Sequence, residues 1–236
     1  MAEPFVSVRD IHFTWPGASA PTLAIEQFEI APAERVFLRG PSGSGKSTLL
    51  GLIAGVITPQ YGDIKVGGKA LSGLSAAKRD QLRAERLGLI FQLFNLVPYL
   101  SVIANVALPL RFSPARRGRI DGPVDHEAQR LLAGLGLEDP ELLTRRVTDL
   151  SVGQQQRVAA ARALIGQPDL VIADEPTSAL DSDVRDRFID LLSKETERSR
   201  AALLFVSHDT ALASHFERSV DLASLNRAPV TAPGGP

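Results

Sequence analysis

The stretch from Arg35 to Ile57, RVFLRGPSGSGKSTLLGLIAGVI, decides the fold of this chain. It begins with a short apolar strand, passes through a glycine-rich loop and continues with apolar residues at helical spacing. A loop of the form GxxxxGKS between a strand and a helix is the context in which such a loop binds phosphate. We therefore predict an α/β protein with a P-loop NTPase core and a mainly parallel sheet.

The residue types in the loop have chemical reasons for their places. Glycines let backbone N–H groups crowd around phosphate oxygens, and the helix that follows adds its positive N-terminal end. Lys46 should reach the β- and γ-phosphates, and the hydroxyl of Ser47 should ligate Mg²⁺. The predicted nucleotide-binding residues of this loop are Gly40, Pro41, Ser42, Gly43, Ser44, Gly45, Lys46, Ser47 and Thr48.

A second stretch, from Leu150 to Asp181, carries two further features. It opens with a Ser/Gly/Gln turn at the start of a predicted helix over residues 152–165. An apolar run over residues 170–173, typical of a parallel strand covered on both faces, then ends in Asp174 and Glu175. At the carboxyl edge of the sheet, Asp174 would orient Mg²⁺ and Glu175 would activate the attacking water.

The remaining elements fit around this core. Alternating apolar residues over 5–30 predict an N-terminal antiparallel β layer, and residues 87–91 and 203–206 predict further strands. We expect one domain over residues 1–225, with a helical subdomain inserted at about 93–166 and a disordered tail over 226–236. Residues 111–123 hold four arginines, two prolines and two glycines, which favours an exposed loop.

Composition excludes several classes of protein. The 236 residues are 44% hydrophobic and contain no cysteine, so disulfides and thiolate metal sites are excluded. A formal net charge of −1 argues against a nucleic-acid partner. We expect no signal peptide, and no apolar stretch approaches the ~18 residues of a spanning helix. A role at a membrane would therefore need another subunit.

The motifs together resemble those of the ATP-binding subunit of an ABC transporter, over nearly all of residues 3–225. GPSGSGKST resembles the Walker A loop, and residues 170–175 resemble Walker B with the catalytic glutamate. LSVGQ, residues 150–154, resembles the signature LSGGQ, and residues 178–181 resemble the D-loop. Gln92 resembles the Q-loop glutamine, His208 the switch histidine and Trp15 the aromatic residue that stacks on adenine, with Phe13 as the alternative.

The resemblance implies an ATP hydrolase that uses Mg²⁺. The implied catalytic residues are Glu175, His208 and Gln92, and the implied metal contacts are Ser47, Gln92 and Asp174. In the family two ATP molecules are sandwiched head to tail, so Ser151, Gly153, Gln154 and Asp181 would complete the site of a second subunit. The implied partners are a membrane permease and a second ATPase subunit in a homodimer, at the cytoplasmic face of the inner membrane.

Two positions depart from the family pattern. Val152 stands where the family usually has glycine. A residue in the first helical turn has negative φ, so valine is sterically allowed, and we expect it to slow turnover mildly. The acidic-glycine turn that usually follows the histidine region is replaced by Leu225-Asn226-Arg227. Because asparagine tolerates left-handed geometry, we expect the turn to survive.

The segment from Leu71 to Leu110 is similar to the branch that releases lipoproteins or exports macrolides and lipids. Importers, and relatives that transmit force without moving a substrate, remain alternatives. A further alternative is an ABC-type ATPase that acts on DNA or ribosomes. A single cassette without a long inserted coiled coil argues against that alternative.

Overall fold

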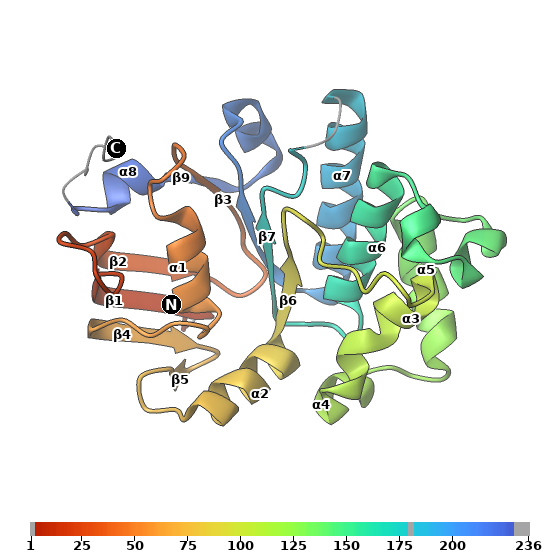
Figure 1. The fold of residues 1–236 in the computed structure, drawn as a ribbon, viewed down its shortest axis with the longest axis horizontal. Helices are drawn as coiled ribbons and strands as arrows, with labels where there is room; N and C mark the ends of the chain where they lie inside the picture. The colour runs from red at the N-terminus through yellow and green to blue at the C-terminus, as the bar shows by residue number, and fades with distance from the viewer. Residues whose placement is uncertain (1–2, 179–181, 229–236) are drawn as a thin grey trace.

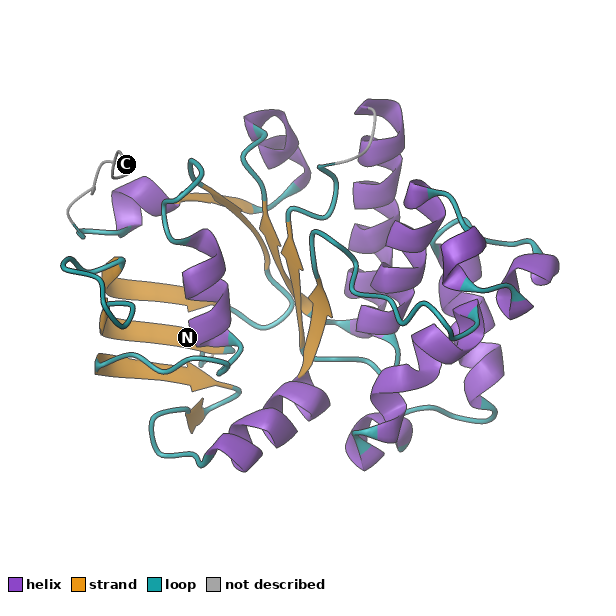
Figure 2. Ribbon diagram, viewed as in Figure 1, coloured by secondary structure: helices purple, strands orange, loops and turns teal. Residues whose placement is uncertain are grey.

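Two β-sheets form the framework, with one helix between them and a group of helices on the other side of the parallel sheet (Figures 1 and 2). The computed structural model describes residues 3–178 and 182–228. In this part of the chain the larger sheet has five strands in the order β6-β7-β8-β3-β9, all paired in parallel. Its strands are β3 (Arg35–Arg39), β6 (Leu87–Ile90), β7 (Leu170–Asp174), β8 (Ala202–Val206) and β9 (Arg218–Asp221).

The smaller sheet is antiparallel and comes mostly from the N-terminal part of the chain. Its order is β2-β1-β4-β5, from β1 (Val6–Phe13), β2 (Leu23–Ile30), β4 (Tyr61–Val66) and β5 (Lys69–Ala70). In β1 the residue Val8 pairs with Phe28 on one side and Ile64 on the other. The predicted fold class, a parallel P-loop core with an antiparallel layer and a helical subdomain, is confirmed.

Helix α1 (Lys46–Ile53) lies between the two sheets (Figure 1). Its side chains Leu49 and Leu52 are buried in one apolar cluster with residues of both sheets. This packing holds the loop in front of α1 rigidly at the edge of the parallel sheet. Three further helices belong to the core region: α2 (Ala76–Arg86), α7 (Ser182–Ser199) and the short α8 (Leu222–Leu225).

A group of helices forms the other side of the molecule, beside α7 and β6 (Figure 1). It contains α3 (Val102–Ala107), α4 (Pro114–Arg117), α5 (Val124–Gly134) and α6 (Val152–Leu164), joined by short 3₁₀ turns. Their apolar faces share one core with Phe37, Phe188 and Phe205 of the parallel-sheet region. None of the helices in the described ranges is long and apolar enough to cross a membrane.

The prediction of an exposed loop over residues 111–123 holds for most of the segment but is wrong at its centre. This segment contains α4, and the side chain of Arg116 is only 2% exposed. The composition of the segment predicted exposure to solvent because arginine and proline usually lie on surfaces. Backbone carbonyls of distant elements bind the Arg116 guanidinium instead, and sequence patterns do not reveal such partners.

The prediction of a left-handed turn at Asn226 is also wrong. Asn226 has φ −89° and ψ 113°, an extended conformation. Its side-chain oxygen accepts from the N–H of Ala24 at 2.8 Å, and its side-chain nitrogen donates to the carbonyl of Thr22 at 2.9 Å. The asparagine therefore fastens the end of α8 to β2 through its side chain, so its function does not need positive φ.

Candidate nucleotide-binding site

A cleft of about 790 Å³ opens at the carboxyl edge of the parallel sheet, where β3, β6, β7 and β8 end. Ligands of open α/β sheets bind at this edge. The cleft brings together most of the predicted nucleotide residues with the predicted catalytic ones. It is lined by Trp15, Thr22, Pro41, Ser42, Gly43, Gly45, Lys46, Ser47, Thr48, Gln92, Asp174, Glu175 and His208.

The glycine-rich loop has the backbone geometry that a phosphate cradle needs. Gly43 and Gly45 have φ of 77° and 97°, in the left-handed region that other residues avoid. A Cβ at Gly45 would come 2.7 Å from Cδ2 of Leu23, and a Cβ at Gly40 would come 2.7 Å from Oγ of Ser44. The Ser44 hydroxyl is buried without a hydrogen-bond partner among the described residues, so a donor is left for an anion in the loop.

Lys46, the first residue of α1, is held on the loop itself. Its ammonium group donates to the carbonyl of Gly40 at 2.6 Å and to that of Pro41 at 3.0 Å. The positive charge therefore lies over the loop, at the N-terminal end of a helix that also favours anions. A phosphate chain bound in the cleft would contact both the Lys46 ammonium group and the N-terminal end of α1.

Ser47 and Asp174 meet across the cleft, as Mg²⁺ binding requires. The Ser47 hydroxyl donates to Oδ2 of Asp174 at 3.2 Å. Burial raises the pKa of the Asp174 carboxyl, and Glu175 adds to this effect, while the Ser47 hydrogen bond and Lys46 oppose it. Gln92 lines the same cleft. One carboxylate, a hydroxyl and an amide oxygen suit Mg²⁺, which takes the rest of its ligands from water and phosphate.

Glu175 follows β7 in a strained backbone conformation, with φ of 46°. Its N–H still donates to the carbonyl of Val206 at 2.9 Å, so the turn is anchored to β8. Nδ1 of His208 lies 3.0 Å from both carboxylate oxygens of Glu175, and the Ser207 hydroxyl donates to one of them at 3.3 Å. The carboxylate is 13% exposed and the histidine 68%, so His208 covers Glu175 on the open side.

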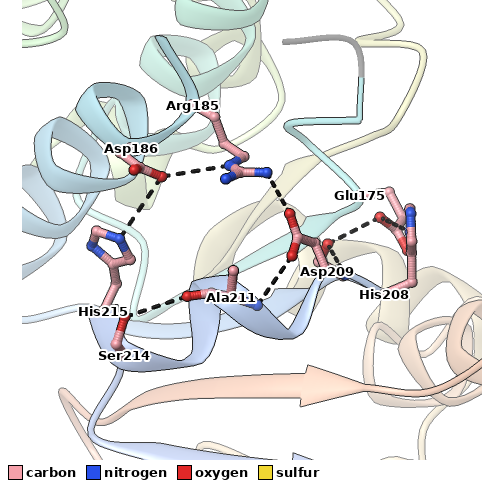
Figure 3. A network of polar contacts seen from close by, with 9 residues as sticks. Glu175, Arg185, Asp186, His208, Asp209, Ala211, Ser214 and His215 are labelled. Carbon is pink, nitrogen blue, oxygen red and sulfur yellow. Dashed lines mark hydrogen bonds and ion pairs between the residues drawn. The ribbon is translucent and has the colours of Figure 1, made fainter. Parts of the chain in front are cut away.

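A chain of polar contacts runs from Glu175 through the Ser207 hydroxyl, which accepts from the N–H of Asp209 at 3.2 Å, to α7 (Figure 3). Asp209 forms an ion pair with Arg185, which lies near the start of α7, and accepts from the N–H of Ala211 at 3.0 Å. Arg185 also lies 3.5 Å from Asp186. Sequence reasoning missed this pair, because Arg185 and Asp209 look like ordinary surface charges until the fold brings α7 beside the segment after β8.

Trp15 lies at the rim of the cleft with 44% of its surface exposed. Its indole N–H donates to the Thr48 hydroxyl at 3.4 Å, and Phe13 supports it edge-on with ring centroids 5.0 Å apart. Phe13 is itself only 4% exposed, so it has no free face for a base. Of the two predicted aromatic residues, Trp15 is therefore the one placed to stack on a ligand.

Comparisons with known proteins agree with this geometry. The family model described as ABC transporter matches residues 24–178. An uncharacterized ABC transporter ATP-binding protein from Mycobacterium tuberculosis (strain CDC 1551 / Oshkosh) is 36% identical over 93% of this chain and 87% of its own length. The same values hold for an uncharacterized ABC transporter ATP-binding protein of strain ATCC 25618 / H37Rv. The chain belongs to the ABC transporter ATP-binding family.

Solved cassettes have the same fold. The dimeric post-hydrolysis state of the ATP-binding cassette MJ0796, bound to ADP and Pi, superposes with a TM-score of 0.82 at 32% identity. The superposed region covers 95% of this chain and 97% of the MJ0796 chain. A dimeric structure of MJ0796, described as a bacterial ABC transporter cassette, gives 0.80 at 30% identity with the same coverage. The family hydrolyses ATP in general.

The signature segment of this cassette does not line the cleft. Ser151 caps α6, accepting from the N–H of Gln154 at 3.3 Å, while the Gln154 side chain accepts from the N–H of Ser151 at 2.9 Å. This capping box leaves the N–H groups of Val152 and Gly153 in the first turn for a ligand. Val152 is 49% exposed beside them. Asp181, predicted from the D-loop, lies outside the described residues.

Gln156 is a second residue that sequence reasoning missed. It lies on α6, is 1% exposed, and donates from its side chain to the carbonyl of Pro176 at 2.7 Å. The bond ties the start of the signature helix to the segment directly after Glu175. Nothing in the sequence singles it out, because it is one of three consecutive glutamines and only this one is buried.

Proposed function

We propose that this cassette binds ATP with Mg²⁺ in the cleft and hydrolyses it, and that it thereby powers a membrane transporter. The proposal rests on the arrangement of Lys46, Asp174 and Glu175, which line one cleft beside the glycine-rich loop. Lys46 and the N-terminus of α1 would hold the β- and γ-phosphates. Mg²⁺, held by Ser47, Asp174 and Gln92, would neutralise charge on the phosphates.

In this proposal Glu175 is the general base. Its carboxylate sits at the open edge of the sheet, fixed by Ser207 and His208, so it can accept a proton from a water attacking the γ-phosphate. His208 is the more exposed of the pair and would contact the γ-phosphate itself. Trp15 would stack on the adenine at the rim.

The signature segment serves a different ATP. Because Ser151, Gly153 and Gln154 do not line their own cleft, they support a head-to-tail dimer in which they cap the γ-phosphate held by a second cassette. The similar structures of MJ0796 are dimeric. We infer a homodimer of this chain.

The glutamate variant Glu175→Gln tests both parts. Phosphate release should fall about 100-fold or more, since the base is lost while all phosphate contacts remain. The variant should also form an ATP-dependent dimer, measured by sedimentation velocity with ATP and Mg²⁺. A variant that keeps its hydrolysis rate would refute the role of Glu175. A variant that stays monomeric with ATP and Mg²⁺ would contradict the head-to-tail dimer outside the membrane complex.

A second surface supports a permease partner and association with the cytoplasmic face of the membrane. A cleft of about 460 Å³ lies between the β6 region and the helices, and its lining includes Phe91, Asn95 and Phe112. Nearby, Leu93 and Tyr99 are 84% and 79% exposed, whereas Leu96 is partly buried against the core. Leu96 is therefore a core residue, and Tyr99 stays free for docking.

The variant Tyr99→Asp, purified with its permease, should lose transport coupling while the isolated chain keeps its basal ATPase rate. An exposed site tolerates the charge, whereas an apolar contact with a partner does not. Loss of the basal rate of a well-expressed variant would instead assign Tyr99 a role in folding. Lys78→Asp, on the exposed side of α2, is a matched surface control.

For the transported material we propose export or extrusion of a lipid, lipoprotein or other hydrophobic compound. The support is the likeness of residues 71–110 to that branch. Mass spectrometry of the co-purifying membrane subunit tests it: a permease with four spanning helices and a large extracytoplasmic part is expected. A subunit of importer type would refute export, and co-purification with ribosomes or DNA would refute the transport role altogether.

A further inference from the structure

Arg116 is a buried arginine that the proposed chemistry does not use. It lies in α4, at the lower end of the helical side of the molecule near the start of β6 (Figure 1). Its side chain is 2% exposed, which makes it the largest of the most deeply buried side chains in the described part of the chain. Arginine is rarely buried unless its donors are matched, so its partners define its role.

All of the recorded acceptors are backbone carbonyls of other elements. Nε donates to the carbonyl of Ile165 at 2.9 Å. One terminal nitrogen donates to the carbonyl of Ala163 at 2.8 Å and also to that of Ile165. The other terminal nitrogen donates to the carbonyl of Leu87 at 3.2 Å. Ala163 and Ile165 are at the C-terminal end of α6, and Leu87 is the first residue of β6. One guanidinium thus joins α4, α6 and the parallel sheet.

The electrostatics suit this place. Burial lowers the pKa of Arg116 to about 10, helped by the nearby charge of Arg119 and opposed by Asp169. The side chain therefore stays a cation at neutral pH. It faces the negative end of the α6 dipole, where the last carbonyls lack partners within the helix. Loss of the arginine would leave these carbonyls buried without donors.

The opposite end of α6 carries Ser151 and the signature residues. The 13 residues of the helix span about 20 Å, so a tilt of about 5° at the Arg116 end moves the signature end by about 2 Å. Gln156, near the N-terminal end of α6, donates to the carbonyl of Pro176 and so fixes that end of the helix. Arg116 and Gln156 therefore hold α6 at both ends, and together they fix the direction in which its N-terminus points.

We infer that Arg116 is a positioning residue for the ATP site of the partner cassette: by clamping the C-terminal end of α6 it sets where the signature N–H groups meet that γ-phosphate. The inference rests on the proposed head-to-tail dimer. Arg116 does not line the nucleotide cleft of its own chain, so ATP binding by a single subunit should not depend on it.

The test uses the full chain with Glu175→Gln, which accumulates the dimer. Arg116→Met keeps the volume and removes the donors, Arg116→Lys keeps the charge with fewer donors, and Arg117→Met is the control on the next, exposed residue of α4. Two quantities are measured: the affinity of the monomer for trinitrophenyl-ATP by fluorescence, and ATP-dependent dimerisation by sedimentation velocity.

We expect Arg116→Met to weaken dimerisation about tenfold or more, because small errors of position are costly in a site that must close on its ligand. Its affinity for the nucleotide should stay within about twofold of the parent. Arg116→Lys should lie between the parent and the methionine variant, and Arg117→Met should match the parent. Unchanged dimerisation, or an equal loss of nucleotide affinity, would overturn the inference.

Gly166→Ala provides an independent variant if Arg116→Met fails to fold. A Cβ at Gly166 would lie 2.8 Å from both Cβ and the carbonyl oxygen of Arg116, and Gly166 has a φ of 69°. Alanine there therefore strains the turn after α6 and pushes α4 away from it without removing the charge. It should weaken dimerisation with little effect on nucleotide affinity. If neither variant folds, Arg116 acts in stability alone and the inference fails. If the parent itself stays monomeric with ATP, the proposed dimer fails instead.

Discussion

The cassette has two helix N-termini suited to phosphate, and they differ in what surrounds them. The start of α1 lies in a cleft with Lys46, Asp174 and Glu175, which in the proposed mechanism would supply charge, a metal ligand and a base. The start of α6 has no acidic residue in its first turn and is capped by its own Ser151 and Gln154. The first is equipped for chemistry, and the second offers only hydrogen-bond donors. This division explains why one chain should need a second to complete each site.

A large effect is expected from Lys46→Ala, which removes the charge of the first site. Charge-assisted hydrogen bonds contribute about 1.5–3 kcal/mol each, so affinity for ATP should fall roughly 10- to 150-fold. Titration with trinitrophenyl-ATP measures it. Lys65→Ala, on β4 of the other sheet, is the matched control and should bind as the parent does.

Lys46 also bonds the carbonyls of Gly40 and Pro41, so the melting temperature must be recorded with the affinity. A variant that binds ATP normally would contradict the assignment of the first site. An unfolded variant would be replaced by Lys46→Met, which keeps the apolar stem of the side chain.

A smaller effect is expected from Arg185→Ala. The Arg185–Asp209 pair is partly exposed and is worth about 1 kcal/mol, so kcat should fall about fivefold as Asp209, which bonds Ser207 beside Glu175, loses its anchor on α7. KM for ATP should stay unchanged, because the phosphate contacts of the loop are intact. Arg187→Ala, at an exposed position on α7, is the control. A rise in KM together with the fall in kcat would show that the pair shapes nucleotide binding instead.

Sequence patterns predicted the parts of both sites that depend on local rules. The loop from Gly40 to Thr48 was predictable because only glycines and a lysine in this order suit a phosphate, and Asp174 because an apolar strand delivers it to the sheet edge. The capping role of Ser151 is likewise local. These features need no knowledge of distant partners.

The parts that were missed depend on contacts across the fold. Arg116 looked exposed because its acceptors, such as Leu87 and Ile165, lie far away in the sequence. Helix α2 was missed because it is strongly polar and only Leu82 of its residues is buried, so no run of apolar residues marks it. For Arg116 the tertiary partners decide the environment, and composition alone gives the opposite indication.

The smallest effect is expected at the second site, the start of α6. Val152 has negative φ in the first turn of α6, so glycine is not required for the backbone, but its β-branch is 49% exposed at the face that would meet the partner. Val152→Gly should raise the ATPase rate of the assembled complex about twofold by removing this crowding. Val152→Ala separates the two possible causes: it removes the branch and keeps helix propensity, so an equal gain assigns the effect to crowding. A gain with glycine alone would assign it to backbone freedom at the helix start, and an unchanged rate in both would show that the second site tolerates valine without cost.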